Sequence, residues 1–188
     1  GAVNMHAVTC LPVITGKWVN KGAGALYGNA GVYPLNWSLV MGLDVRDKSV
    51  RELDMCRLGS ILLGDEEDLK SGPPVKALLI QNTNPAVVCP DQNKVHEGFR
   101  RDDLFMVVHE QFMTETAEFA DIVLPATMFL EHEDMYTGGG HVYFSVTKPV
   151  IEAPGECRSN HDLMCALAER LGLDHRGFKM SAEEVFDA

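Results

Sequence analysis

Three short apolar runs, separated by stretches long enough for helices, constrain the fold of this chain more than any other feature. The runs cover residues 75–80, 104–108 and 122–124, and prolines or polar residues bound them. Such runs are typical of parallel strands buried on both faces and joined by crossover helices, and they differ from the alternating pattern of an antiparallel sandwich. The sequence therefore predicts an α/β fold with an open, mostly parallel sheet.

Helices are predicted on either side of these strands and after them. They cover residues 7–14, 92–100, 115–120, 162–171 and 182–186, the first being the tail of a helix that begins abruptly. Thr114 and Ser181 are suitable N-caps for two of them, and Ser159 or Asn160 for a third. Gly172 is placed to end that third helix. Together these elements predict a Rossmann-like arrangement, a sheet with flanking helices.

The chain is expected to divide into three parts. Residues 1–74 are expected to form a glycine-rich lead-in and a helical connection, whose first helix is expected to be truncated at its N-terminus. Residues 75–174 form the α/β core, and residues 175–188 a C-terminal tail with a short helix. The lead-in contains four aromatic residues, Trp18, Tyr27, Tyr33 and Trp37. Because aromatic rings are costly to leave in water, we expect a partner surface there.

Charge and cysteine spacing exclude several classes of function. The formal net charge of -11 argues against nucleic acid as a partner, because phosphate backbones are bound by clustered Lys and Arg. The five cysteines form no CxxC pair, so local spacing supports neither a zinc ribbon nor an iron–sulfur cluster. No apolar run approaches the roughly 20 residues that span a bilayer. We expect no nucleic acid and no direct membrane insertion, and leave the compartment open between cytoplasm and periplasm.

Polar loops follow the three predicted strands, at the edge where an open parallel sheet binds its ligands. They cover residues 81–85, 109–111 and 125–127. Asn82, Thr83 and Asn84 offer amide and hydroxyl groups for a ribose or phosphate, and Glu110 offers a carboxylate for the N1 and N2 donors of guanine. Loops rich in Asn are equally common without any ligand, so the spacing alone supports both readings.

A second group of polar residues could suggest a metal site, but its spacing gives this interpretation little support. It comprises His132, Glu133, Asp134 and His141, with His109 and Glu110. Metal motifs on helices place two ligands at i and i+4, whereas residues 132–134 are consecutive and point in different directions. The chain also contains no nucleophile elbow and no P-loop. We assign it no catalytic and no metal-ligating residue.

Several of these segments together resemble a known family. Residues 81–85 and 104–110, the run Thr-Glu-Thr-Ala at 114–117, and the run Ala-Asp-Ile-Val-Leu-Pro-Ala at 120–126 resemble the third domain of the molybdopterin oxidoreductases. This family includes dimethyl sulfoxide reductase, formate dehydrogenase and periplasmic nitrate reductase. Further matches include Gly140-His141 and Arg158-Ser159, so the resemblance covers most of residues 7–172.

The resemblance implies an enzyme in which two molybdopterin guanine dinucleotides chelate one molybdenum or tungsten. Each dinucleotide tail is held by a separate α/β domain, and this chain would hold one tail. By position in the family, the contacts fall on Asn82, Thr83 and Asn84, on His109 and Glu110, and on His132, Asn160 and Asp162.

Two of these positions depart from the family pattern. The pair His109-Glu110 stands where many members have Ser-Asp. Glu110 thus keeps a carboxylate for guanine, on a side chain longer than that of Asp. His132 stands where some members have Lys, so the charge it offers a phosphate depends on pH.

The family's metal-ligating side chain and iron–sulfur cysteines lie upstream of the matched region, and its C-terminal barrel lies downstream. We therefore expect the remaining domains of a parent polypeptide as partners, and no turnover by this chain alone. The alternative is a stand-alone nucleotide-binding or protein-interaction module that kept the fold without redox activity. The substrate and the choice between molybdenum and tungsten do not follow from these residues.

Overall fold

The computed structural model describes residues 2–25, 33, 35–138 and 141–188 and divides the chain into two compact units. One unit comprises Gly1–Leu35 with Met135–Val146. The other comprises Asn36–Asp134 with Thr147–Ala188 and contains the sheet. The second unit carries the candidate site.

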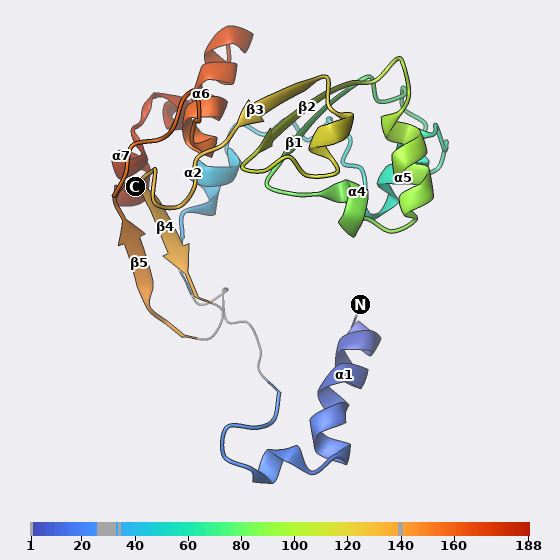
Figure 1. Cartoon of the computed structure of the whole chain (residues 1–188), viewed down its shortest axis with the longest axis vertical. Coiled ribbons are helices and arrows are strands. Elements are labelled where there is room, and N and C mark those ends of the chain that lie inside the picture. Colours follow the sequence, from blue (N-terminus) through green and yellow to red (C-terminus); the bar gives the residue numbers. More distant parts are fainter. Residues whose placement is uncertain (1, 26–32, 34, 139–140) are drawn as a thin grey trace. The chain divides into compact units, whose positions relative to one another are not determined.

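A three-stranded parallel sheet organises this larger unit (Figure 1). Its strands are β1 (Ala77–Gln81), β2 (Phe105–Glu110) and β3 (Ile122–Pro125), in the order β1-β2-β3. Gln81 pairs with His109, and Glu110 pairs with Pro125, so the carboxyl ends of the three strands lie at one edge. This confirms the predicted α/β fold with an open parallel sheet.

Two short helices connect β1 to β2. They are α4 (Pro85–Val88) and α5 (Gln92–Phe99), of which only α5 was predicted. The predicted helix at residues 115–120 is wrong, because a single 3-10 turn, η4 (Ala117–Phe119), connects β2 to β3. Residues 111–121 are too few for a crossover with a full helix, which needs a dozen residues or more.

Helices with clear capping signals formed as predicted. Helix α6 (Asn160–Leu171) begins where the Ser159 side chain accepts a bond from Asp162 N, and it ends at Gly172 in the left-handed region, φ 67°. Helix α7 (Ala182–Asp187) begins with a capping box between Ser181 and Glu184. The remaining elements of this unit are α2 (Trp37–Met41), η3 (Met55–Arg57), α3 (Leu58–Leu62) and η5 (Arg176–Lys179).

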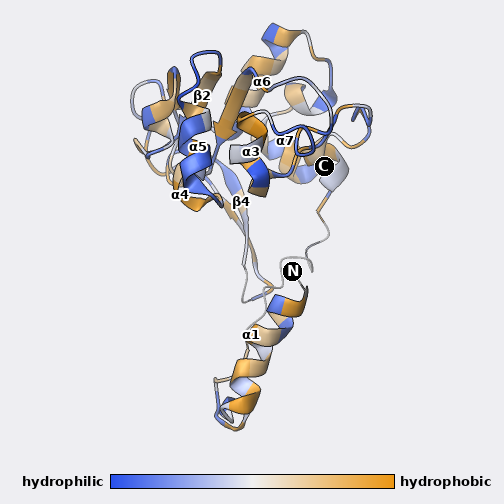
Figure 2. Ribbon diagram, turned by 90° about the vertical axis from the view of Figure 1, so that its right-hand side faces the viewer, coloured by the Kyte–Doolittle hydropathy of each residue, from blue (hydrophilic) through white to orange (hydrophobic). Residues whose placement is uncertain are grey.

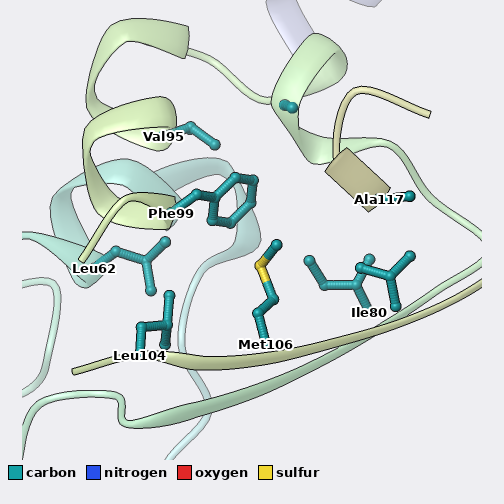
Figure 3. Close-up of a cluster of buried hydrophobic side chains, with 9 residues drawn as sticks. Leu62, Ile80, Val95, Phe99, Leu104, Met106 and Ala117 are labelled. Atoms are coloured by element: carbon teal, nitrogen blue, oxygen red, sulfur yellow. The ribbon is translucent and has the colours of Figure 1, made fainter. Parts of the chain in front are cut away.

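The core lies between one face of the sheet and helices α3 and α5. Figure 3 shows Ile80, Leu104 and Met106 directed toward Phe99 and Leu62. Val95 is completely buried in this cluster and Met106 is 1% exposed. These side chains therefore account for the apolar runs that predicted the strands.

The opposite face of the sheet is only partly covered by the described chain. Leu79 is 40% exposed and Phe105 is 50% exposed. This face and helix α6 line an apolar groove of about 370 Å³, formed by Ala77, Leu78, Leu79, Phe105, Val107, Leu124, Leu163 and Leu167. The expectation of strands buried on both faces is therefore met only in part, since among the described residues one face of the sheet has a full layer of helices and the other faces α6 alone.

The smaller unit contains α1 (Ala2–Ile14) and η1 (Lys17–Val19), followed by Tyr33. Helix α1 carries no charged Asp, Glu, Lys or Arg, and Figure 2 shows it coloured largely for apolar residues. The Tyr33 hydroxyl lies 2.9 Å from the carbonyl oxygen of His141 and accepts a bond from Gly138 N at 3.2 Å. The tyrosine therefore joins two segments that are distant in sequence.

Two further strands, β4 (Asp134–Thr137) and β5 (Phe144–Thr147), form a two-stranded sheet. Alternation of the residues at 141–146 predicts one strand there, and β5 begins three residues later, whereas β4 was not predicted. Of the aromatic residues in the lead-in, Trp18 and Trp37 are more than half exposed and Tyr27 lies outside the described residues. Among the described helices, none has the length and apolar character needed to cross a membrane.

Close packing of α3 against α5 requires a residue without a side chain at position 98, which Gly98 provides. A Cβ at Gly98 would lie 2.5 Å from the Cβ of Leu62. We expect Gly98→Ala to lower the free energy of unfolding by about 1–3 kcal/mol, because overpacking outweighs the gain in helix propensity of about 1 kcal/mol. Urea denaturation measures this change. Glu97→Ala, an exposed position on the same helix, is the control, and equal midpoints for the two variants would contradict the packing described here.

Candidate functional site

Three polar side chains meet where the sheet ends and helix α6 begins. The Gln81 side-chain nitrogen lies 3.1 Å from Nδ1 of His109 and 3.0 Å from Oδ1 of Asn160. Nε2 of His109 lies 3.2 Å from the carbonyl oxygen of Arg158. The tautomer with its proton on Nε2 satisfies both contacts of the ring. His109 is completely buried, so it links β1 and β2 to the segment before α6 from inside the protein.

Backbone pairing brings the start of α6 to this edge. Ala126 and Arg158 form a parallel β-bridge directly after β3. Arg158 N donates to the carbonyl of Pro125 at 3.1 Å, and Thr127 N donates to the carbonyl of Arg158 at 3.1 Å. These bonds place Asn160 near the ends of strands that precede it by many residues. The Ser159 side chain accepts a bond from Asp162 N at 3.1 Å and donates to Oδ2 of Asp162 at 2.8 Å, so Ser159 caps α6.

The loop after β1 exposes two of its three polar residues. Asn82 has a φ of 58°, in the left-handed region that Asn tolerates, and both Asn82 and Thr83 are exposed. Neither side chain has a hydrogen-bond partner among the described residues. The loop therefore presents an amide and a hydroxyl to solvent beside the end of β2.

The third residue of the loop, Asn84, is occupied inside the protein. Its Nδ2 donates to Oε2 of Glu115 at 2.8 Å, and its Oδ1 accepts from the Thr116 hydroxyl at 2.6 Å. Thr116 is buried, and its oxygen accepts a bond from Ala86 N at 3.0 Å. The bond from Asn84 also lowers the pKa of the Glu115 carboxyl below its ordinary value. Asn84 thus fixes the β1 loop to the loop after β2.

Glu110 ends the central strand and keeps one carboxylate oxygen available. Oε1 accepts a bond from Gln111 N at 2.7 Å, and within the described residues Oε2 has no hydrogen-bond partner. The neighbouring Gln111 side chain donates to the carbonyl of Thr127 at 2.8 Å. The Glu110 side chain is half-buried, so its second oxygen is accessible at the sheet edge.

His132 lies close to the same edge. Its Nδ1 is 2.7 Å from the hydroxyl of the buried Thr127, and its Nε2 is 3.5 Å from the Asp134 carboxylate. His132 and Asn160 line one pocket of about 160 Å³. Asn160 also lines a second pocket of about 520 Å³, whose walls are mostly apolar and include Gln81 and Phe178. Across the parts of the chain that are described, no three His, Cys, Asp or Glu side chains gather to hold a metal ion.

The structure therefore brings some of the predicted residues together and separates others. His109 and Asn160 meet through Gln81, and His132 and Asn160 share a pocket. Asn82, Thr83 and Glu110 line neither of these two pockets. Gln81 was not predicted as a site residue, although its position at the end of the first apolar run could have suggested it. The Arg158 carbonyl carries no sequence signal, because any residue supplies a backbone oxygen.

Comparisons with known proteins agree with this architecture. A profile of the family described as molybdopterin oxidoreductase matches residues 24–170. "Probable oxidoreductase YoaE" from Bacillus subtilis is 42% identical over 184 residues, which cover 97% of this chain and 26% of that protein. "Periplasmic nitrate reductase" from Desulfovibrio desulfuricans is 37% identical over 116 residues, 60% of this chain and 15% of that protein.

A solved structure shows the same kind of partial match. Acetylene hydratase from Pelobacter acetylenicus superposes with a TM-score of 0.52 and 27% identity, over 63% of this chain and 16% of that one. The chain thus spans between 15% and 26% of the length of these three relatives. Because the family profile covers most of the sequence and a relative matches nearly all of it, the chain belongs to the molybdopterin oxidoreductase family.

Proposed function

We propose that residues 75–174 bind the guanine dinucleotide tail of a molybdopterin cofactor, as one part of a larger redox enzyme. The family implies a pterin cofactor with molybdenum or tungsten. The observation that carries the finer proposal is the available oxygen of Glu110 at the end of the central strand. Ligands of open parallel sheets bind at this edge, which supports a nucleotide there.

The chemistry of Glu110 fits a guanine ring. Guanine presents two adjacent N–H donors, and an ionised carboxylate is an acceptor that can receive both. Because Gln111 N already holds Oε1, the carboxylate is oriented before any ligand arrives. Only the bonds to the base then need to form, and less conformational freedom is lost on binding.

The exposed β1 loop fits the ribose and phosphate part of the tail. Asn82 and Thr83 offer an amide and a hydroxyl that are not used within the described chain. Asn84 contributes indirectly, because it fixes this loop to Thr116. His132 and Asn160, which share a pocket, are proposed as further contacts, while Asp162 holds the start of α6.

His109 receives a different role from the direct contact that the family resemblance implied. Both of its ring nitrogens have partners, Gln81 and the Arg158 carbonyl, and the ring is completely buried. We assign it as a positioning residue that keeps the strand ends and α6 together. The adjacent Glu110 then carries the contact with the ligand.

The redox chemistry belongs to the whole enzyme. When bound, the cofactor supplies a redox-active metal for two-electron or oxygen-atom transfer. We propose that the remaining domains of the parent polypeptide hold the metal ligand and any iron–sulfur cluster, in the cytoplasm or the periplasm. In this proposal the chain binds and orients the dinucleotide. The names of the two relatives, an oxidoreductase and a nitrate reductase, support a redox role for the whole enzyme.

Titration calorimetry of the chain with GDP tests the guanine contact. We expect Glu110→Ala to weaken GDP binding by about 10- to 100-fold, because hydrogen bonds to a charged group contribute about 1.5–3 kcal/mol. Glu118→Ala removes an exposed carboxylate on η4 instead and should bind GDP like the parent chain. ADP should bind more weakly than GDP. Unchanged GDP affinity in Glu110→Ala would rule out this recognition.

Urea denaturation separates the positioning role of His109 from the contact role of Glu110. His109→Ala leaves the Gln81 amide and the Arg158 carbonyl without a buried partner, and we expect a loss of about 2–4 kcal/mol in the free energy of unfolding. Glu110→Ala should stay within about 1 kcal/mol of the parent chain, because its side chain accepts one partly exposed bond. A His109→Ala variant as stable as the parent would show that the buried ring does not hold this edge.

A further inference from the structure

Two of the five cysteines are neighbours in the structure, although 32 residues separate them in the sequence. Cys56 lies in η3, and Cys89 directly follows α4. The Cys89 thiol donates a hydrogen bond to the carbonyl oxygen of Met55 at 3.6 Å, and Met55 directly precedes Cys56 in the chain. Peptide geometry then places the Cys89 sulfur at most about 6.4 Å from the Cα atom of Cys56.

The Cys89 sulfur is therefore within reach of the Cys56 side chain after side-chain movements. The two sulfurs must approach to about 2 Å to form a disulfide, and rotation about χ1 of each cysteine moves its sulfur by more than about 2 Å. Cys56 is exposed, so a small reagent reaches its sulfur, while Cys89 is half-buried beside it. Burial raises the pKa of the Cys89 thiol, and the nearby Cys56 raises it further, which agrees with two thiols in close proximity.

We propose that Cys56 and Cys89 form a redox modification site that accepts an intramolecular disulfide. The oxidant is a small disulfide such as oxidised glutathione. The Cys56 thiolate attacks one sulfur of this disulfide, so that a mixed disulfide forms and one thiolate leaves. The Cys89 thiolate then attacks the Cys56 sulfur and expels the second small thiolate. Two protein thiols are oxidised, one small disulfide is reduced to two thiols, and the two protons released by the cysteines protonate the leaving thiolates.

The bridge would anchor helix α4 at both ends. Asn84 and Thr116 already hold the start of α4 through the bond from Ala86 N. A bond between Cys89 and Cys56 would fix its end to the segment that begins α3. The exposed Asn82 and Thr83 lie directly before this helix, so oxidation would restrict the segment that carries them. This inference does not depend on the proposed nucleotide.

Mass spectrometry of the folded chain in a glutathione redox buffer tests the proposal. We expect the reactive thiols to fall from five to three and the mass to fall by about 2 Da, with one tryptic cross-link between the peptides of Cys56 and Cys89. Urea-unfolded chain under the same buffer should give a mixture of pairings. Thermal unfolding of the oxidised chain should have a higher midpoint than that of the reduced chain.

Single variants distinguish the roles of the two thiols. Cys89→Ser should retain one glutathione on Cys56, because no second thiol is present to release it. Cys56→Ser should gain neither the bridge nor an adduct at Cys89. Cys157→Ser is the matched control and should form the bridge as the parent chain does. Five thiols that stay reduced in the folded chain, or a cross-link that includes Cys10, Cys157 or Cys165, would overturn the proposal.

Discussion

A completely buried imidazole at the edge of the sheet is the constraint on which the site depends. Removing the polar ring of His109 from water is favourable only if both nitrogens find partners, and Gln81 and the Arg158 carbonyl supply them. The partners come from β1 and from the segment before α6, so satisfying one side chain fixes three segments. The need to pair buried polar groups therefore determines how the three segments are arranged at this edge, because a shift of any of them would leave such a group without a partner.

The same reasoning bears on the proposed nucleotide site, where exposed polar groups adjoin groups that are bonded inside the protein. Thr116 is buried and bonded to Asn84 and Ala86, so the end of the loop after β1 is fixed. Asn82 and Thr83 extend from that fixed point into solvent. Polar groups held on a rigid frame lose little freedom when they bind a nucleotide. The internally bonded groups, Asn84 and Thr116, thus hold the loop in place, and the exposed groups, Asn82 and Thr83, are available to a ligand.

Local signals predicted the fold well where neighbouring residues alone decide the structure. Ser159, Gly172 and Ser181 marked the ends of α6 and α7 correctly, because caps act within one helical turn. The helix expected at residues 115–120 failed because the short connection between β2 and β3 allows only one tight turn. The strands and their parallel direction followed from the apolar runs, whereas the partly open second face could not be predicted from strands that are apolar on both sides.

The candidate site was less predictable, for a physical reason. The polar loops could be located because carboxyl ends of parallel strands share an edge. Which of their residues would be occupied internally depended on distant partners, such as Asn160 for Gln81 and Glu115 for Asn84. The residues proposed to contact the dinucleotide remain a prediction of the family resemblance, and the structure adds a reason to weight Glu110 over His109.

The apolar groove on the open face of the sheet has a consequence for the chain in solution. Parallel sheets are almost always covered on both sides, and contiguous apolar surface in water promotes association. The side chains of Leu79 and Phe105 would therefore drive the chain to self-associate as its concentration rises. The particle size of the chain should consequently fall on dilution and in mild detergent. A sheet whose second face is covered by helices would show no such dependence.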